Sequence, residues 1–221
     1  MNINNCSFPD HLLYDLDNFT WVNYCDNDLI KLGITPIITS LSGKLKSIKI
    51  KDIGSSIEKG KSVASIESSK YFGIIRTPFS GIIKEINNDL LNNPKLANNS
   101  PYEKGWFIKI LLDKQPFENN SLEYIRTCEN KIRFIINDLK VKCFKEFPDY
   151  EMYEIGQECA ATLNKLDELL TRINIGEIVY LVSDDITADL ELLRWSDNTS
   201  QPIIDLRKEN SLFHFLIKKE R

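Results

Sequence analysis

The chain has 221 residues, of which 42% are hydrophobic and 27% are charged, and its formal net charge at pH 7 is -4. This length is natural for two domains with their own cores, while the acidic balance excludes nucleic acid as the main partner, because phosphate binding needs clustered positive charge. No apolar stretch approaches the roughly 20 residues that span a bilayer, and no signal-peptide pattern is visible, so a cytoplasmic protein without a membrane partner is expected.

Two short patterns occur twice in the first half of the chain. Ser42–Ile48 is similar to Ser80–Ile86, and the tripeptide Glu-Lys-Gly at 58–60 returns at 103–105, each time before an apolar run. Each copy supplies glycine-containing turns and short strands, and neither copy could bury its apolar face alone. We therefore expect the two halves to close into a small flattened β barrel or sandwich. The second half also carries a longer insertion, residues 87–101, rich in Asn and Pro.

Between the two copies, residues 63–73 predict a β-hairpin with a lysine at its tip. The apolar run Val63–Ile66 and the run Gly73–Ile75 are typical of strands, and Ser68 and Ser69 supply small polar residues for a turn. Lys70 should therefore point into water with its flanks anchored. A lysine on a turn is usually only a solubilising charge, but the flanking repeats favour a site of modification.

The order of these blocks resembles the glycine cleavage H protein family, over roughly residues 6–112. The resemblance implies an all-β, lipoyl-domain-like barrel-sandwich hybrid with a C-terminal helix. It also implies that Lys70 carries lipoate in amide linkage and that Glu67 helps the attachment enzymes to recognise the site. The protein would then be a carrier and not an enzyme, because the cofactor supplies the chemistry. The blocks are Gly33-Ile34-Thr35, Gly60–Ala64, Glu67–Lys70, Pro78–Gly81 and Pro101–Trp106.

Within this family, three segments look more like the lipoate-binding proteins of the sulfur-oxidising heterodisulfide-reductase-like system: Cys6–Tyr14, Leu41–Lys44 and Gly60–Gly73. The chain departs from the family pattern at Phe19, where a histidine is usual, and at Ser69. The partners implied are a lipoate ligase or other lipoyl-attachment enzymes, and either a heterodisulfide-reductase-like complex or the glycine cleavage enzymes. Dihydrolipoamide dehydrogenase is a further candidate partner, and no metal site is expected.

A long amphipathic helix is predicted after the polar link 113–120. Ser121 has the character of an N-cap, and apolar residues recur at steps of three and four as far as Cys143, so the helix should end near Phe147. The expected domains are therefore a lipoyl carrier domain at 1–118, a connecting helix at 119–148 and a second domain at 149–221.

The second domain should be a small α+β two-layer sandwich with the order βαβαββ. Its strands are expected at 152–155, 178–182, 202–206 and 212–218. Its first helix should run from Cys159 to Ile173, and its second should be capped by Asp184 and Asp185 and end at Trp195. His214, which alternates with two phenylalanines, is expected on the solvent side of the last strand.

Over residues 150–219 this pattern is similar to the TusA family of sulfur carriers. The similarity rests on Gly156–Cys159, Ser183–Asp185 and Phe213–Lys219, and it implies that Cys159 accepts a sulfane sulfur as a persulfide. The amino end of a helix suits this role, because its dipole stabilises a thiolate. Ala160, Thr162 and Ile186 replace prolines that are usual in the family, and a buried structural cysteine is the alternative.

Three functions remain open from the sequence. The second domain could supply sulfur to a lipoyl arm, which would carry it to an oxidising complex. Alternatively, the protein is a glycine cleavage H protein that shuttles an aminomethyl group, or it is an unmodified adaptor. The five cysteines are odd in number and scattered, which predicts free thiols in a reducing compartment rather than disulfides.

Overall fold

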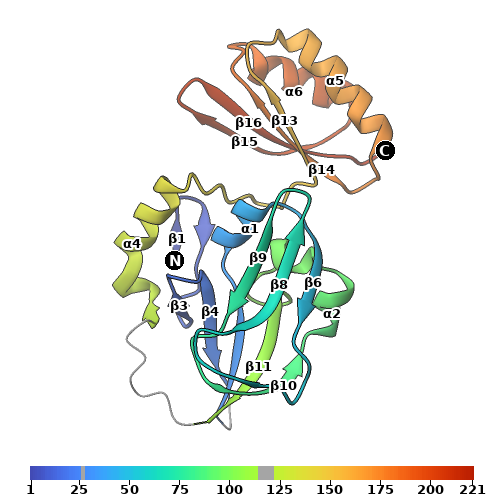
Figure 1. Ribbon diagram of the computed structural model, residues 1–221. Helices are drawn as coiled ribbons and strands as arrows, with labels where there is room; N and C mark the ends of the chain where they lie inside the picture. The colour runs from blue at the N-terminus through green and yellow to red at the C-terminus, as the bar shows by residue number, and fades with distance from the viewer. Residues whose placement is uncertain (26–27, 114–121) are drawn as a thin grey trace. The chain divides into compact units, whose positions relative to one another are not determined.

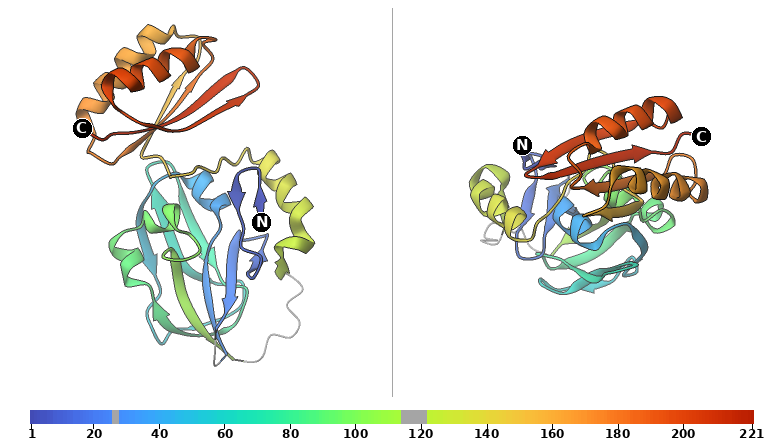
Figure 2. Two further views of the ribbon diagram at one scale, coloured as in Figure 1. Left: turned by 180° about the vertical axis from the view of Figure 1, so that it is seen from behind. Right: turned by 90° about the horizontal axis from the view of Figure 1, so that it is seen from above.

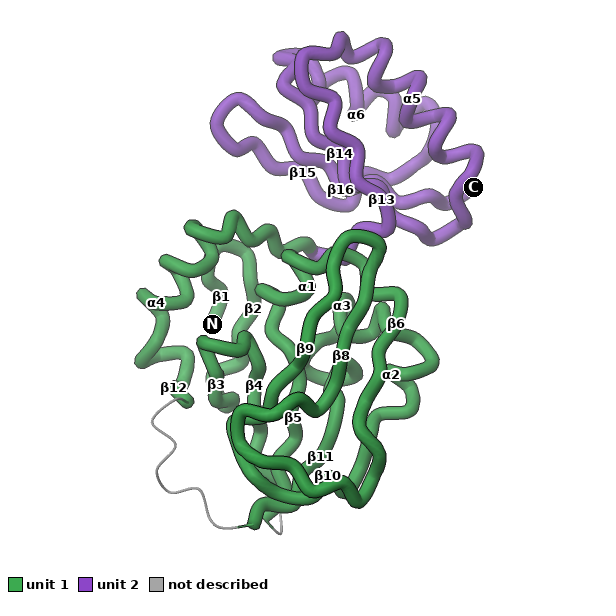
Figure 3. Tube along the Cα trace, viewed as in Figure 1, with its two compact units in different colours: residues 1–144 green, residues 145–221 purple. Residues whose placement is uncertain are grey.

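The computed structural model describes residues 1–25, 28–113 and 122–221 (Figure 1). These residues form two compact units, Met1–Phe144 and Lys145–Arg221 (Figure 3). The predicted N-cap Ser121 lies outside the described residues. Within the described ranges, none of the helices combines the length and the apolar character that crossing a membrane would require.

Unit 1 is built mainly of two β-sheets that face each other. The larger has seven strands in the order β12-β3-β4-β5-β11-β10-β7, and the smaller has the order β6-β8-β9. Neighbouring strands in both sheets are antiparallel. The large sheet comprises β3 (Leu13–Asp15), β4 (Thr20–Tyr24), β5 (Leu29–Ile34), β7 (Ser56–Ile57), β10 (Gly81–Ile86), β11 (Trp106–Leu112) and β12 (Leu122–Tyr124); the small sheet comprises β6 (Leu45–Ile50), β8 (Ser62–Ser68) and β9 (Phe72–Arg76).

The main core of unit 1 lies between these two sheets. Leu32, Ile66, Ile83 and Phe107 are among its fully buried side chains, and burying such side chains drives the sheets together. The repeated sequence pattern places one strand in each sheet, β6 in the small one and β10 in the large one. Among the described residues no paired strand joins the two sheets, so they form an open sandwich and no closed barrel.

Three short helices interrupt this β architecture. The sequence prediction of an all-β domain did not include them. Pro36 opens α1 at a position where its missing N–H costs nothing, and the Asn87 side chain accepts a hydrogen bond from Leu90 N at the start of α2. The insertion at 87–101 thus contains two of the helices. Their bounds are α1 (Pro36–Ser42), α2 (Asn88–Asn92) and α3 (Leu96–Asn99).

The long helix is shorter than predicted at both ends. It is α4 (Ile125–Asp138), and it belongs to unit 1. Leu122, expected within the helix, lies instead in β12, which pairs with β3. At the other end Lys140 has a positive φ of 51°, a left-handed conformation that stops a helix. The apolar stripe of α4 packs against the N-terminal ribbon β1 (Asn2–Ile3) and β2 (Cys6–Ser7) in a second core cluster.

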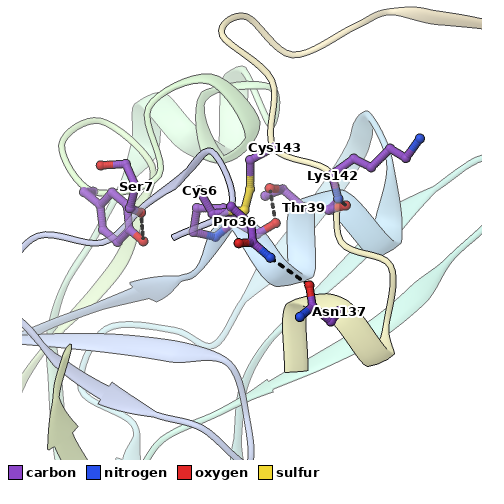
Figure 4. Close-up of a disulfide and its surroundings, with 10 residues drawn as sticks. Cys6, Ser7, Pro36, Thr39, Asn137, Lys142 and Cys143 are labelled. Atoms are coloured by element: carbon purple, nitrogen blue, oxygen red, sulfur yellow. Dashed lines mark hydrogen bonds between the residues drawn. A yellow bond between two sulfur atoms is a disulfide. The ribbon is translucent and has the colours of Figure 1, made fainter. Parts of the chain in front are cut away.

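A disulfide joins Cys6 to Cys143 (Figure 4), so the expectation that all cysteines are free was wrong. The bond links the N-terminal ribbon to the segment that follows α4. A hydrogen bond from Lys142 N to Ser40 Oγ at 2.9 Å holds the same segment, and one from Asn4 Nδ2 to Asn137 Oδ1 at 2.7 Å joins the ribbon to the last turn of α4. The two cysteines are 137 residues apart in sequence, which is why spacing gave no sign of the pair.

Unit 2 has the expected order of elements. Its sheet has the order β13-β14-β16-β15, in which β13 runs parallel to β14 and the other pairs are antiparallel. Both helices cover the same face of this sheet, as Figure 2 shows, and close a third core cluster around Leu166, Leu192 and Phe215. The elements are β13 (Tyr150–Glu154), α5 (Cys159–Arg172), β14 (Ile178–Ser183), α6 (Ala188–Thr199), β15 (Ile203–Glu209) and β16 (Leu212–Lys218).

The second helix of unit 2 begins later than predicted. Asp184 and Asp185 precede it, but its N-cap residue is Thr187, and it continues past Trp195 to Thr199. Asp185 instead accepts hydrogen bonds at 2.8 Å from Thr187 N and from Cys159 N. Asp185 therefore connects the starts of α5 and α6, whereas the sequence predicted only that it caps the second helix.

Candidate functional site

The predicted hairpin is present, and Lys70 lies at its tip. Strands β8 and β9 pair with Glu67 opposite Phe72, which leaves residues 68–71 as the connection. Ser68 N donates to Tyr71 O at 2.8 Å and closes the turn, while Ser68 Oγ accepts from Lys70 N at 3.2 Å. Lys70 is exposed. The structure confirms an exposed residue at the tip of a hairpin with anchored flanks.

The side chain of Lys70 extends over the carboxyl end of α1. A methyl group added at Gly43, the residue that ends this helix, would lie 2.9 Å from Cε of Lys70 and 3.6 Å from its Nζ. Gly43 has φ 75° and ψ -161°. This region of φ and ψ is accessible essentially only to glycine, and any other residue here would be strained by on the order of 1–3 kcal/mol. The hairpin is fixed to the same place, because Ser68 Oγ donates to Ser42 O at 2.6 Å.

A second glycine supports the next residue of the hairpin. A methyl group at Gly73 would lie 2.4 Å from Cε1 of Tyr71, so the tyrosine ring lies directly over that glycine. Phe72 is 66% exposed and Ile74 is 49% exposed on the outer face of β9. Phe72 and Ile74 therefore form an exposed apolar stripe on the strand that follows the lysine.

Glu67 lies on the same outer face as Phe72, one ladder step from the turn. It is exposed, and its cross-strand neighbours are Phe72 on β9 and Ser47 on β6. A carboxylate at this place is accessible to a protein that approaches the hairpin tip. The structure thus brings the two predicted site residues of the first domain, Lys70 and Glu67, to one small surface.

This surface suits covalent modification more than catalysis. It offers a primary amine on a hydrogen-bonded turn, with a glycine below its stem. Among the residues that the structure describes, no group of three or more His, Cys, Asp or Glu side chains is placed to hold a metal ion. An acyl group on Nζ would continue the lysine side chain into solvent, so the residues present fit a tethered arm.

Several residues around Lys70 were missed by sequence reasoning. Asn98 of α3 donates through Nδ2 to Gly43 O at 3.0 Å and accepts through Oδ1 from Leu45 N at 3.0 Å. The repeated Ser-Gly block contains Ser42 and Gly43, and the Asn-rich insertion contains Asn98. Nothing in the sequence, however, indicated that the insertion returns to the hairpin.

The third predicted site residue, Cys159, lies in unit 2 as the first residue of α5. Its N–H donates to Asp185 Oδ2 at 2.8 Å, and its side chain is buried. Burial, and then the negative charges of Asp185 and Glu191, raises the pKa of the Cys159 thiol to about 11. Hydrogen bonds from Thr187 and Cys159 lower the pKa of Asp185 and keep it ionised. At neutral pH these effects oppose the helix dipole and favour the thiol over the thiolate.

We therefore expect Cys159 to react slowly with iodoacetamide at pH 7.5 in the folded protein. At pH 7.5, about 3.5 units below that pKa, only about one thiol in three thousand is ionised, so the rate should rise roughly tenfold per pH unit up to about pH 11. Quenched alkylation followed by peptide mass spectrometry measures this rate. Asp185→Asn should accelerate the reaction at pH 8, since it removes one negative charge. A rate that levels off below pH 9 would show that the thiolate is stabilised after all.

His214 is not on a solvent-exposed face, and the prediction for it was wrong. The side chain is 5% exposed. Its Nδ1 lies 2.7 Å from the hydroxyl of Tyr180, and the two rings are stacked with centroids 5.9 Å apart. Glu209 on β15 brings a carboxylate oxygen to 3.6 Å from Nε2. His214 thus contacts Tyr180 and Glu209 of its own sheet, and strand alternation alone does not predict these contacts.

Comparisons with known proteins place the first unit in a family. The sequence pattern of the family described as "Glycine cleavage H-protein" matches residues 12–133. The chain is 36% identical over 144 residues to a protein of Sulfurisphaera tokodaii described as "Probable glycine cleavage system H protein 2", covering 64% of this chain and 97% of that protein. It is 32% identical over 149 residues to "Glycine cleavage system H protein 5" of Aquifex aeolicus, covering 64% of this chain and 97% of the other.

A solved structure shares the fold. The crystal structure of a glycine cleavage system H protein from Mycobacterium marinum matches with a TM-score of 0.50 and 22% identity, covering 57% of this chain and 98% of that one. The match supports the lipoyl-domain type of sandwich for unit 1. Because the family pattern extends over more than half of the chain, the protein belongs to the glycine cleavage H-protein family.

Proposed function

We propose that this protein is a lipoyl carrier in which lipoate is joined in amide linkage to Nζ of Lys70. Members of its family are carriers of lysine-bound lipoate and not catalysts. The observation that carries the proposal is the position of Lys70 at the exposed tip of the β8–β9 hairpin, with Gly43 below its stem. Glu67, on the same surface, is proposed to contact the enzyme that attaches lipoate.

The arm would give the protein its chemistry. Lipoate supplies a strained, reducible disulfide that can take up a group or electrons and release them to another enzyme. The protein supplies the position, since a tether of this kind raises the effective concentration of the reactive sulfurs at a docked enzyme to roughly millimolar. The hairpin is suited to this task because its turn is fixed by Ser68 while the lysine itself is exposed.

We propose the aminomethyl group of glycine as the cargo, with the glycine cleavage enzymes as partners. The names of the related proteins favour this cargo over sulfur. The test is to incubate the lipoylated protein with glycine and a glycine decarboxylase and to follow its intact mass. The disulfide of the arm is the oxidant, so one sulfur should gain the aminomethyl group and the other a hydrogen. We therefore expect the mass to increase by that of methylamine, with release of carbon dioxide. If the Mycobacterium marinum H protein is loaded in parallel and this protein is not, the proposed cargo is wrong.

Sulfur is the second candidate cargo, and one feature of unit 2 favours it. The order β13, α5, β14, α6, β15, β16 is the order expected for a TusA-like sulfur carrier, and Cys159 is the first residue of the first helix; on these two features we propose the similarity. The raised pKa of Cys159 weighs against a persulfide there. Persulfide transfer to the wild-type protein that is lost in Cys159→Ser would support this cargo. Transfer that survives the substitution would remove Cys159 from the proposal.

A further inference from the structure

Gly43 lies below the side chain of Lys70 and contacts its outer methylene groups. We infer that Gly43, held in its conformation by Asn98, forms a seat for the stem of the modified lysine and sets the direction in which the lipoyl arm leaves the protein. The inference rests on the proposed attachment of lipoate to Lys70. It makes Gly43 and Asn98 positioning residues, which act on the arm without contributing to its chemistry.

The first step is the contact between Lys70 and Gly43. Position 43 has room for the lysine stem only because it has no side chain: a Cβ there would lie 2.9 Å from Cε and 4.0 Å from Cδ of Lys70. The outer part of the lysine stem therefore lies against backbone. Amide formation at Nζ changes the end of this side chain and leaves its four methylene groups in place, so the same contact is available to the modified lysine.

The second step is what fixes the seat. Asn98 is 7% exposed and bridges the peptide groups on both sides of Lys44, donating to Gly43 O and accepting from Leu45 N, each at 3.0 Å. A carboxamide can donate and accept at the same time, which a carboxylate or an alkyl side chain cannot do. Ser42 Oγ adds a bond to Gly43 O at 3.3 Å. The unusual backbone conformation of Gly43 is thus held from two sides.

The third step is the anchor of Asn98 itself. Its helix, α3, lies in the insertion at 87–101, and the nearby Asn87 side chain donates to Lys104 O and Trp106 O, each at 2.7 Å. Gly105 lies so close to α3 that a methyl group there would be 2.8 Å from Cα of Ala97. The insertion is therefore bound to β11. Asn98, which holds Gly43 below the hairpin of the small sheet, is in this way anchored to the large sheet.

The lysine is also held from the hairpin side. Ser68 Oγ accepts from Lys70 N at 3.2 Å and donates to Ser42 O at 2.6 Å. One hydroxyl thus connects the backbone of the modified residue to the residue before Gly43. With its backbone bound to Ser68 and its stem lying on Gly43, the lysine loses much of the rotamer freedom that an exposed lysine has. A partner enzyme then has less of the arm to order when it binds.

Nitrogen NMR on the modified lysine tests the seat directly. In protein labelled with 15N only at lysine Nζ, the acylated lysine gives the single amide-type N–H signal, and its heteronuclear NOE reports motion on the picosecond to nanosecond timescale. We expect an NOE close to that of ordered backbone in the wild type. In Gly43→Ala we expect it to fall to the value of an unrestrained side chain, and in Asn98→Ala to an intermediate value.

Asn99→Ala is the matched control, because Asn99 neighbours Asn98 in α3 and is exposed; its NOE should equal the wild-type value. Backbone spectra establish that each variant is folded, and Asn98→Ala tests the seat if Gly43→Ala fails to fold. A flexible signal in the wild type, or an ordered one that survives Gly43→Ala or Asn98→Ala, overturns the inference and leaves the proposed function intact. The absence of any lysine amide signal after treatment with a lipoate ligase overturns both.

Discussion

Lys70→Arg should abolish the attachment of lipoate completely. Arginine keeps the positive charge and a stem of similar length, but its guanidinium remains protonated and does not form the amide. The structure gives this substitution little reason to harm the fold, since Lys70 is exposed at a turn. Incubation with a lipoate ligase, ATP and lipoate, followed by intact-mass measurement, should show one added lipoyl group in the wild type and none in the variant.

Lys84→Arg is the control for this experiment. Lys84 is an exposed lysine within a strand, β10, and not at a hairpin tip. The Lys84→Arg variant should be lipoylated to the wild-type extent. If Lys70→Arg still gains the lipoyl mass, the amine that is modified lies elsewhere. If the wild type gains none with an active ligase, the unmodified adaptor becomes the better description of this protein.

Local patterns sufficed for the part of the site that lies within one hairpin. Strands of alternating and apolar character, two serines and a lysine occupy consecutive positions, so the turn and the exposure of Lys70 follow from neighbouring residues. The same holds for unit 2, where strand and helix periods are regular and the order of elements was correctly predicted. The bounds differ by a few residues: β13 begins at Tyr150, β15 extends to Glu209, and α6 runs from Ala188 to Thr199. Asp185, which was expected to cap α6, bonds both to the start of α5 and to Thr187.

The contacts that support Lys70 could not be predicted in this way. Asn98 lies 55 residues from Gly43 along the chain, and an asparagine in a polar insertion is most often a surface residue. Likewise, Leu122 continues an apolar helical stripe in sequence, yet pairing with β3 places it in a strand. In both cases a partner distant in sequence decided the outcome, and local propensity is a weak guide against such contacts.

The disulfide gives the second large effect, on stability. We expect the double variant Cys6→Ala/Cys143→Ala to be less stable than the oxidised wild type by on the order of 4 kcal/mol. A bond across 137 residues removes much of the conformational entropy of the unfolded chain, and loops of this length lie at the upper end of the usual range. The bond spans almost all of unit 1, so the loss should appear in the unfolding of that unit.

Thermal unfolding followed by near-ultraviolet circular dichroism measures this effect. For a chain of this size a loss of that magnitude should lower the midpoint of the transition by roughly 10 °C. Cys25→Ala provides the control, since Cys25 is a partly exposed free cysteine outside the bond, and its midpoint should stay within about 2 °C of the wild type. A wild-type midpoint that is the same with and without reductant during unfolding would contradict the prediction.

The position of the bond makes this result relevant to the site as well as to the fold. Lys142, next to Cys143, donates its N–H to Ser40 of α1, and α1 ends at the glycine below Lys70. When the bond is absent, the covalent link between the segment after α4 and the N-terminal ribbon is lost. We therefore expect hydrogen exchange to accelerate first at Lys142 and then in α1 of the double variant, while exchange in the β8–β9 ladder remains slow. Equal acceleration in both regions would mean that unit 1 opens as a whole and that the bond does not act through α1.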